Sequence, residues 1–320
     1  MKRLTFPASS NDYLFKILMK VSVIIPVYNN AKLTKQCLES IFAVGAQVDF
    51  EVIVVDNGSS DETAKILTAL SGKILTIQNE RNLGFAKACN QGAKQARGKF
   101  VVFLNNDTIV TDGWLDQLVA TMESGTEIGA VGAKLIYPNQ TIQHAGVVFA
   151  ANSLPYNIYK GEKKDSPLVN KNKEYQAVTG ACLLTAKAFF QEVDGFDENY
   201  QNGLEDIDFC FKLRASGKKI IYCADSVVLH YESMTEGRGG FLENNERFFL
   251  QKWRGKIKID DRQHLEKDGY LKDKLTVATL IEVRDNELER LNKELATVKS
   301  LFFWRGIKLY LRFKSWLKKK

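Results

Sequence analysis

The stretch Phe100-Val-Val-Phe-Leu-Asn-Asn-Asp-Thr108 joins a strongly apolar run to a polar end. Its first five residues predict a strand that is buried on both faces, as in a parallel sheet. The run then stops at Asn105, Asn106 and Asp107. A carboxylate at the end of a buried strand is a suitable ligand for a hard divalent cation, but the same three residues are also typical of a turn. The rest of the chain has to decide between these two interpretations.

Strand and helix patterns alternate on the N-terminal side of this stretch. Buried strands are predicted at 21–26, 51–56 and 74–77, and helices at 31–43 and at about 84–96. This alternation predicts an α/β fold with a mostly parallel, Rossmann-like central sheet that is wound by right-handed crossovers and flanked by helices.

Polar residues follow three of these strands. Tyr28, Asp56 and Asp107 each stand at a different strand end, and in parallel sheets ligands bind at the carboxyl ends of the strands. Together they suggest a nucleotide site. The first strand runs into Pro26-Val-Tyr-Asn-Asn30, which lacks the glycines of a dinucleotide fingerprint or a P-loop. We therefore expect a metal at Asp107, and not a glycine cradle, to hold the phosphates.

The second half of the chain adds three further candidate positions. Gly180-Ala181, in the strand-like segment 175–184, marks either the close approach of a ligand or a small pair under a packed helix. Glu205 and Asp206 fall in the first turn of a predicted helix, where acids serve as caps but can also act as a general base. The segments 219–223 and 226–230 are strand-like, and His230 ends the second of them. With Asp107 already a candidate, we favour a metal-ligand role for His230 over a structural one.

Composition limits the classes of function. The 320 residues are 45% hydrophobic, and the five scattered cysteines suit neither a disulfide framework nor a zinc site, so we expect the cytoplasm. No run is long enough for a membrane span. The seven cations of 301–320 equal the net charge of +7, which leaves a neutral body and argues against a nucleic-acid partner.

The C-terminal part divides into two segments. Hydrophobic heptads at 275–298 indicate either a coiled-coil homodimer or a helix docked on the body. Aromatic and basic residues interleave in 301–320, as in an amphipathic helix on an anionic membrane surface. The expected organisation is an extension at 1–20, a domain at 21–255, a helical segment at 256–300 and a membrane-associating tail at 301–320.

Six motifs between about Val21 and Trp253 resemble, in order, those of the family 2 glycosyltransferases. The resemblance implies a GT-A fold, with a nucleotide-sugar half at about 21–136 and an acceptor half at about 137–255, and transfer with inversion. The motifs are Val21-Ser-Val-Ile-Ile-Pro-Val-Tyr-Asn29, Val54-Val-Asp-Asn-Gly-Ser-Ser-Asp61, Asn79-Glu-Arg-Asn-Leu-Gly-Phe85, Phe103-Leu-Asn-Asn-Asp-Thr108, Thr179-Gly-Ala181 and Gly203-Leu-Glu-Asp-Ile-Asp-Phe209.

The resemblance also implies roles for individual residues. Asp107, in the place of the Asp-x-Asp motif, and His230 are expected to bind Mn²⁺ or Mg²⁺, with Asn105 standing where that motif has its first acid. Asp206 is the expected base, with Glu205 as the fallback. Asp56 is expected to contact the nucleobase, and Arg238 and Trp253 are candidates for the acceptor side. The expected nucleotide- and donor-binding residues are Pro26, Tyr28, Asn29, Asp56, Arg81, Gly84, Asn105, Asn106, Gly180 and Ala181.

The Asn-Asn-Asp variant, the segment Gln143-His-Ala-Gly146 and the late histidine look most similar to rhamnosyltransferase-type members. We therefore expect dTDP-rhamnose as the donor, with a UDP-sugar (galactose, glucose or N-acetylhexosamine) as the alternative. The expected acceptor is a growing lipid-linked cell-surface polysaccharide, made at the inner face of the cell membrane. A nucleotidyltransferase and a non-catalytic membrane-tethered scaffold are the competing classes.

Overall fold

The computed structural model describes residues 20–231, 241–270, 291 and 295. The chain divides into two units, Met1–Asp261 and Arg262–Lys320. Helix α8 (Asp261–Lys267) begins at the boundary. In the second unit Leu291 and Leu295 are helical, with exposed fractions of 47% and 50%. The other residues of the predicted heptads, the tail at 301–320 and the extension at 1–19 lie outside the described residues.

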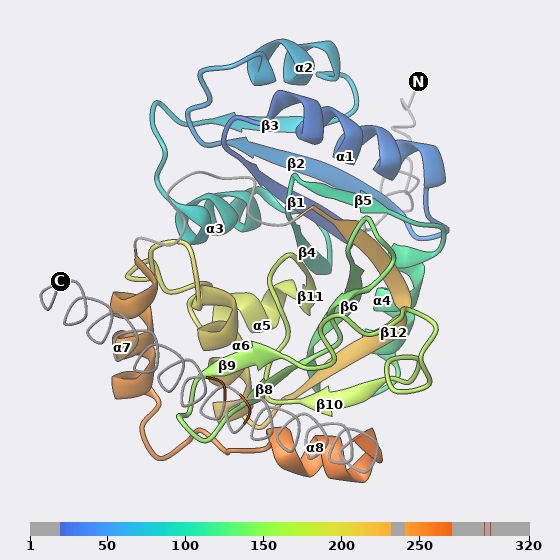
Figure 1. Cartoon of the computed structure of the whole chain (residues 1–320). Coiled ribbons are helices and arrows are strands. Elements are labelled where there is room, and N and C mark those ends of the chain that lie inside the picture. Colours follow the sequence, from blue (N-terminus) through green and yellow to red (C-terminus); the bar gives the residue numbers. More distant parts are fainter. Residues whose placement is uncertain (1–19, 232–240, 271–290, 292–294, 296–320) are drawn as a thin grey trace, which may run out of the picture. The chain divides into compact units, whose positions relative to one another are not determined.

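A ten-stranded sheet forms the centre of the first unit, with the strand order β10-β12-β6-β11-β4-β1-β2-β3 and with β5 and β7 paired to β12 and β6 (Figure 1). A separate hairpin consists of β8 (Val147–Phe149) and β9 (Pro155–Asn157). The strands of the large sheet are β1 (Val21–Val27), β2 (Phe50–Asp56), β3 (Leu75–Gln78), β4 (Phe100–Leu104), β5 (Thr108–Val110), β6 (Ile128–Ile136), β7 (Ile142–His144), β10 (Lys173–Tyr175), β11 (Cys182–Ala186) and β12 (Lys219–His230).

The first four strands of the chain confirm the predicted parallel core. Strand β1 pairs in parallel with both β2 and β4, and β2 pairs in parallel with β3. Their carboxyl ends therefore meet at one edge of the sheet. The second half of the sheet is mixed, because β11 enters antiparallel between β4 and β6 while β12 runs parallel to β6.

Two strand predictions in the second half were wrong in detail. Residues 179–181 lie in the loop before β11 and not in a strand. Gly180 lies against Asp206 there, outside the hydrogen-bond ladder of the sheet. The segments Lys219–Cys223 and Ser226–His230 form one strand, β12, whose register shifts between Cys223 and Val227. This β-bulge accommodates the break in the apolar pattern without ending the strand.

Helices cover both faces of the sheet. Those of the first unit are α1 (Ala31–Val44), α2 (Thr63–Ala69), α3 (Phe85–Gln95), α4 (Trp114–Glu123), α5 (Lys187–Glu192), α6 (Glu205–Ala215) and α7 (Leu242–Lys252).

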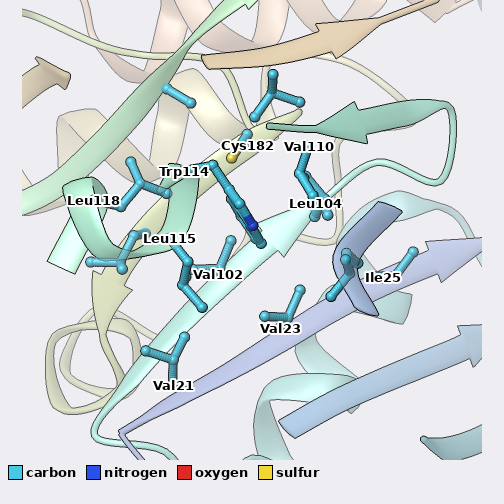
Figure 2. Packing of buried hydrophobic residues seen from close by; sticks show 14 of the residues in the cluster. Val21, Val23, Ile25, Val102, Leu104, Val110, Trp114, Leu115, Leu118 and Cys182 are labelled. Atoms are coloured by element: carbon cyan, nitrogen blue, oxygen red, sulfur yellow. The ribbon is translucent and has the colours of Figure 1, made fainter. Parts of the chain in front are cut away.

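Alternation along β1 assigns the helices to the two faces. Val21, Val23 and Ile25 join one apolar cluster with α1 and α4, and Figure 2 shows Trp114 of α4 beside the strand residues. Ile24 points the opposite way, toward Gly92 of α3. A strand whose successive side chains are all buried must be covered on both sides, which explains the continuous apolar runs of the sequence.

An aromatic cluster fixes helix α6 on the second face. Phe103 of β4 lies 4.7 Å from Phe196 and 4.9 Å from Phe190, measured between ring centroids. Phe209 of α6 packs against both of these rings at 5.3 Å. The cluster holds the N-terminus of α6, which carries Glu205 and Asp206, near the carboxyl end of β4.

Candidate active site

One pocket opens at the carboxyl ends of β1 and β4, and it receives side chains from both halves of the first unit. Ten of the residues singled out from the sequence line it: Pro26, Tyr28, Asn105, Asn106, Asp107, Gly180, Ala181, Glu205, Asp206 and His230. Segments that are distant in the sequence thus converge on one pocket, whereas Asp56, which was expected at the same edge as Tyr28 and Asp107, does not line it.

The turn after β4 is fixed by hydrogen bonds on each of its residues. The Asn105 backbone N–H donates to the Ala181 carbonyl at 3.0 Å, and the Asn106 side chain donates to the Thr34 hydroxyl at 2.9 Å. The Asp107 carbonyl accepts from Tyr231 N–H at 3.0 Å. These contacts hold each residue of the Asn-Asn-Asp turn in place.

Asp107 and His230 meet within this pocket. Strand β5 pairs antiparallel with β12, and the register sets Thr108 opposite His230. Asp107 Oδ1 therefore lies 3.0 Å from His230 Nε2, with both side chains largely buried. The Asn105 amide nitrogen lies 3.3 Å from the same ring nitrogen.

The donor set of Asp107 and His230 fits a divalent cation. Cations such as Mg²⁺ bind ligands at about 2.1 Å in octahedral geometry, so two neighbouring ligand atoms stand about 3.0 Å apart. Among the described residues no cluster of three or more His, Cys, Asp or Glu side chains could hold a metal. A site of one carboxylate and one imidazole suits a cation that takes its remaining ligands from substrate phosphates and water.

Asp206 and Glu205 lie at the start of helix α6, as predicted. Asp206 Oδ2 accepts from Gly180 N–H at 2.6 Å and Oδ1 accepts from Ile207 N–H at 2.8 Å. Glu205 is 6% exposed, and its Oε2 accepts from Gly203 N–H at 2.6 Å. The more exposed Asp206 carboxylate is held in one orientation by two backbone donors, as positioned bases are.

Four predicted donor-binding residues do not line the pocket, and two of them hydrogen-bond to a nearby loop. Asn29 accepts from Ser60 N–H at 2.8 Å, and the buried Asp56 accepts from Ser59 N–H at 2.9 Å. Gly84 has φ 90° and precedes α3, a conformation that favours glycine. Arg81 is exposed, and its backbone packs against Gly58. Their contacts with a nucleotide stay predictions.

The two acceptor-side candidates differ in outcome. Trp253 is 6% exposed and does not line the pocket; its indole N–H donates to Asp208 Oδ1 at 2.7 Å. The ring also packs against Phe211 of α6. The structure therefore gives Trp253 a packing role that joins the end of α7 to α6. Arg238 lies outside the described residues.

Several pocket residues were missed from the sequence, and most of them carry carboxamides. Gln143 contacts His230, and Asn157 Oδ1 lies 2.7 Å from His144 Nδ1. The only sequence signal is that Gln143 opens the Gln-His-Ala-Gly segment and that Asn157 follows it in the chain. A loop-rich stretch of sequence gives no strand register from which to place either side chain. The missed lining residues are Val27, Asn57, Asn82, Phe85, Leu135, Gln143, Asn157, Thr179 and Asn202.

The sheet order, the flanking helices and the pocket at the strand ends define a GT-A domain. The crystal structure of GalNAc-T7 with UDP, GalNAc and Mn²⁺ has this arrangement, with a TM-score of 0.60 and 20% identity over 75% of this chain and 49% of that one. Residues 22–180 match the model of Glycosyl transferase family 2, so the chain carries a domain of that family.

Two relatives match a larger part of the chain. The uncharacterized protein y4gI of Sinorhizobium fredii is 32% identical over 238 residues, covering 71% of this chain and 26% of that protein. The O-antigen biosynthesis protein RfbC of Myxococcus xanthus is 32% identical over 222 residues, covering 67% of this chain and 17% of that protein. The chain thus spans about a quarter or less of the length of these relatives.

Proposed function

We propose that the chain is a glycosyltransferase that moves a sugar from a nucleotide-sugar donor to a hydroxyl group of a polysaccharide or glycolipid, with inversion at the anomeric carbon. The observation that carries the proposal is that Asp107, His230 and Asp206 line one pocket. Sugar transfer from a diphosphate needs what these groups can supply. Negative charge grows on the leaving diphosphate, and the acceptor hydroxyl loses a proton as it attacks.

In this mechanism Asp107 and His230 hold Mn²⁺ or Mg²⁺, which when bound neutralises charge on the leaving diphosphate. Asp206 takes the proton of the acceptor hydroxyl. Its carboxylate is fixed by Gly180 and Ile207, so little reorientation is needed in the transition state. One base suffices for a single displacement, which inverts the anomeric centre.

The donor we favour is dTDP-rhamnose, and a UDP-sugar (galactose, glucose or N-acetylhexosamine) is the alternative. Support for rhamnose comes from the resemblance of the Asn105-Asn106-Asp107 variant, the Gln143-His-Ala-Gly146 segment and His230 to rhamnosyltransferase-type members. The three residues of the variant, Gln143 and His230 all line the pocket. Support for UDP comes from GalNAc-T7, whose structure contains UDP and Mn²⁺. The relative RfbC, named for O-antigen biosynthesis, supports a cell-surface polysaccharide as the acceptor class.

A donor panel tests the function. The purified 320-residue chain is screened for Mn²⁺-dependent thermal shifts with dTDP-rhamnose and UDP-sugars, and the strongest donor is then assayed with a lipid-linked acceptor. We expect Mn²⁺-dependent release of the nucleoside diphosphate and a glycosylated product. Pyrophosphate release from a nucleoside triphosphate would instead indicate a nucleotidyltransferase. Absence of any metal-dependent nucleotide binding would indicate a scaffold.

We further propose that residues 301–320 bind the chain to the inner face of the cell membrane and that residues 275–298 form a homodimer. Seven cations among aromatic side chains suit an anionic lipid surface. Within the described residues no helix has the length and apolarity to cross a bilayer. Deleting 301–320 should abolish co-sedimentation with anionic liposomes and leave donor hydrolysis intact; equal sedimentation of both proteins would refute membrane binding.

A further inference from the structure

A buried carboxamide, Gln143, lies behind the imidazole of His230. Gln143 is 2% exposed, and its Oε1 lies 2.6 Å from His230 Nδ1. Its amide nitrogen donates to the backbone carbonyl of the same histidine at 3.3 Å. One side chain thus hydrogen-bonds both the ring and the backbone carbonyl of His230.

The position of Gln143 follows from an irregularity in the sheet. Strand β7 pairs antiparallel with β6, with Ile142 opposite Ile136 and His144 opposite Leu135. Gln143 is therefore the extra residue of a β-bulge. Bulges re-aim a side chain and are common next to active sites. Here the re-aimed side chain reaches the last residue of β12, a strand that also pairs with β6.

The two hydrogen bonds determine which ring nitrogen of His230 carries the proton. A backbone carbonyl can only accept, so the amide nitrogen of Gln143 must face it and Oε1 must face the ring. Oε1 also only accepts, so Nδ1 must be the protonated nitrogen. In the neutral imidazole Nε2 is then left with its lone pair, directed at the space it shares with Asp107 Oδ1, 3.0 Å away.

We propose that Gln143 is a positioning residue that locks His230 in the Nδ1–H tautomer, with the Nε2 lone pair presented beside Asp107 as cation binding requires. The inference rests on the proposed function, in which these two residues hold Mn²⁺ or Mg²⁺. Partners behind a metal-binding histidine fix its tautomer and orientation, and losing one typically weakens metal affinity about 10- to 100-fold.

The test uses the ¹⁵N-histidine-labelled 320-residue chain without metal. The sequence has three histidines, so substituting Gln for His144 and for His264 assigns the ring signals. Long-range ¹H–¹⁵N spectra are recorded at rising pH until the His230 shifts stop changing. The neutral ring should show a protonated Nδ1 in the wild type. Gln143→Leu should shift it toward the Nε2–H tautomer, whereas Gln143→Glu, which keeps an acceptor, should preserve Nδ1–H.

Metal affinity gives a second readout, measured from the electron paramagnetic resonance signal of free Mn²⁺ in the presence of UDP. Gln143→Leu should raise the Mn²⁺ dissociation constant about 10- to 100-fold. A wild-type Nε2–H tautomer, or Nδ1–H retained in Gln143→Leu, would overturn the proposal. A wild type that binds no Mn²⁺ but shows the expected tautomers would overturn the metal assignment of the proposed function and leave the role of Gln143 standing.

Discussion

Asp107 Oδ1 and His230 Nε2 lie 3.0 Å apart, although the two residues come from opposite halves of the domain. The pairing of β5 with β12 brings them together, because Thr108 stands opposite His230 in that ladder. The candidate metal pair is therefore built on sheet hydrogen bonds and not on flexible loops. Sites on rigid elements keep their geometry without substrate, as a preorganised cation site requires.

Removing the charge of Asp107 should weaken metal-dependent nucleotide binding. Asp107→Asn keeps the size of the side chain but replaces a carboxylate ligand with a weaker carboxamide. We expect the Mn²⁺ affinity in the presence of UDP to fall at least about tenfold, because losing even a residue that only supports a metal ligand typically weakens metal affinity about 10- to 100-fold. Calorimetric titration with and without EDTA measures this. Asp112→Asn, at an exposed position after β5, is the matched control. Equal affinity in both variants would contradict the assignment.

Adding one methyl group at Gly180 should displace the candidate base. A Cβ at this position would lie 2.9 Å from the Cβ of Asp206, and the Gly180 N–H bonds Asp206 Oδ2. Gly180→Ala should therefore lower kcat about 100-fold, because small misplacements of catalytic groups have effects of that order. Gly72→Ala, where the added Cβ meets open space, should leave kcat unchanged. A Gly180→Ala enzyme with wild-type kcat would show that Asp206 tolerates the shift.

The sequence predicted those parts of the site that depend on strand ends and helix starts. Asp107 follows a run of five apolar residues, and Asp206 opens a helix, so local patterns place both. Gln143 escaped prediction because its position depends on a bulge between β7 and β6, which is a property of pairing and not of local sequence. Trp253 was expected on the acceptor side, whereas its partner Asp208 is brought to it only by the packing of α6.

Asp208 should be a main contributor to the stability of the domain. It is fully buried, and its Oδ1 accepts from Trp253 and from the Tyr200 hydroxyl and lies 2.8 Å from Lys252 Nζ. Asp208→Ala should lower the free energy of unfolding by about 2–5 kcal/mol, because it leaves the buried donors of Trp253 and Tyr200 without this acceptor, whereas Lys252 keeps Asp197 as a partner. Urea denaturation measures the change.

The matched control for Asp208 is Glu243→Ala on α7. Glu243 pairs with Arg247 at 3.3 Å, but both side chains are exposed, at 89% and 73%. Exposed pairs contribute about 0–1 kcal/mol, so the control should unfold close to the wild-type urea concentration. A similar small loss in both variants would argue against the buried network as a stabilising element.

His144 should make the stability of the domain dependent on pH in the acid range. Burial lowers the pKa of His144 from 6.5 to about 4, and this outweighs the hydrogen bond with Asn157, which acts in the opposite direction. Between these values the unfolded chain binds a proton that the folded chain does not. The contribution is therefore fully present above pH 6.5 and is lost as the pH falls toward 4, by up to about 3 kcal/mol.

Urea unfolding of the wild type and of His144→Gln at a series of pH values isolates this contribution. The substituted side chain does not titrate, so the wild type should lose more stability than the variant between pH 6.5 and 4. Parallel curves for the two proteins would contradict the effect. The comparison concerns how the free energy of unfolding changes with pH. A loss of stability that is the same at every pH therefore does not affect the result.

The role of Asp206 as the base tests the account most directly. With the donor that gives the strongest Mn²⁺-dependent thermal shift, and with a lipid-linked acceptor, kcat for transfer is compared between the wild type and Asp206→Asn. The isosteric amide cannot take the acceptor proton, so we predict that kcat falls about 10²- to 10⁴-fold while the donor still binds with wild-type affinity. Transfer by Asp206→Asn at the wild-type rate would contradict the account.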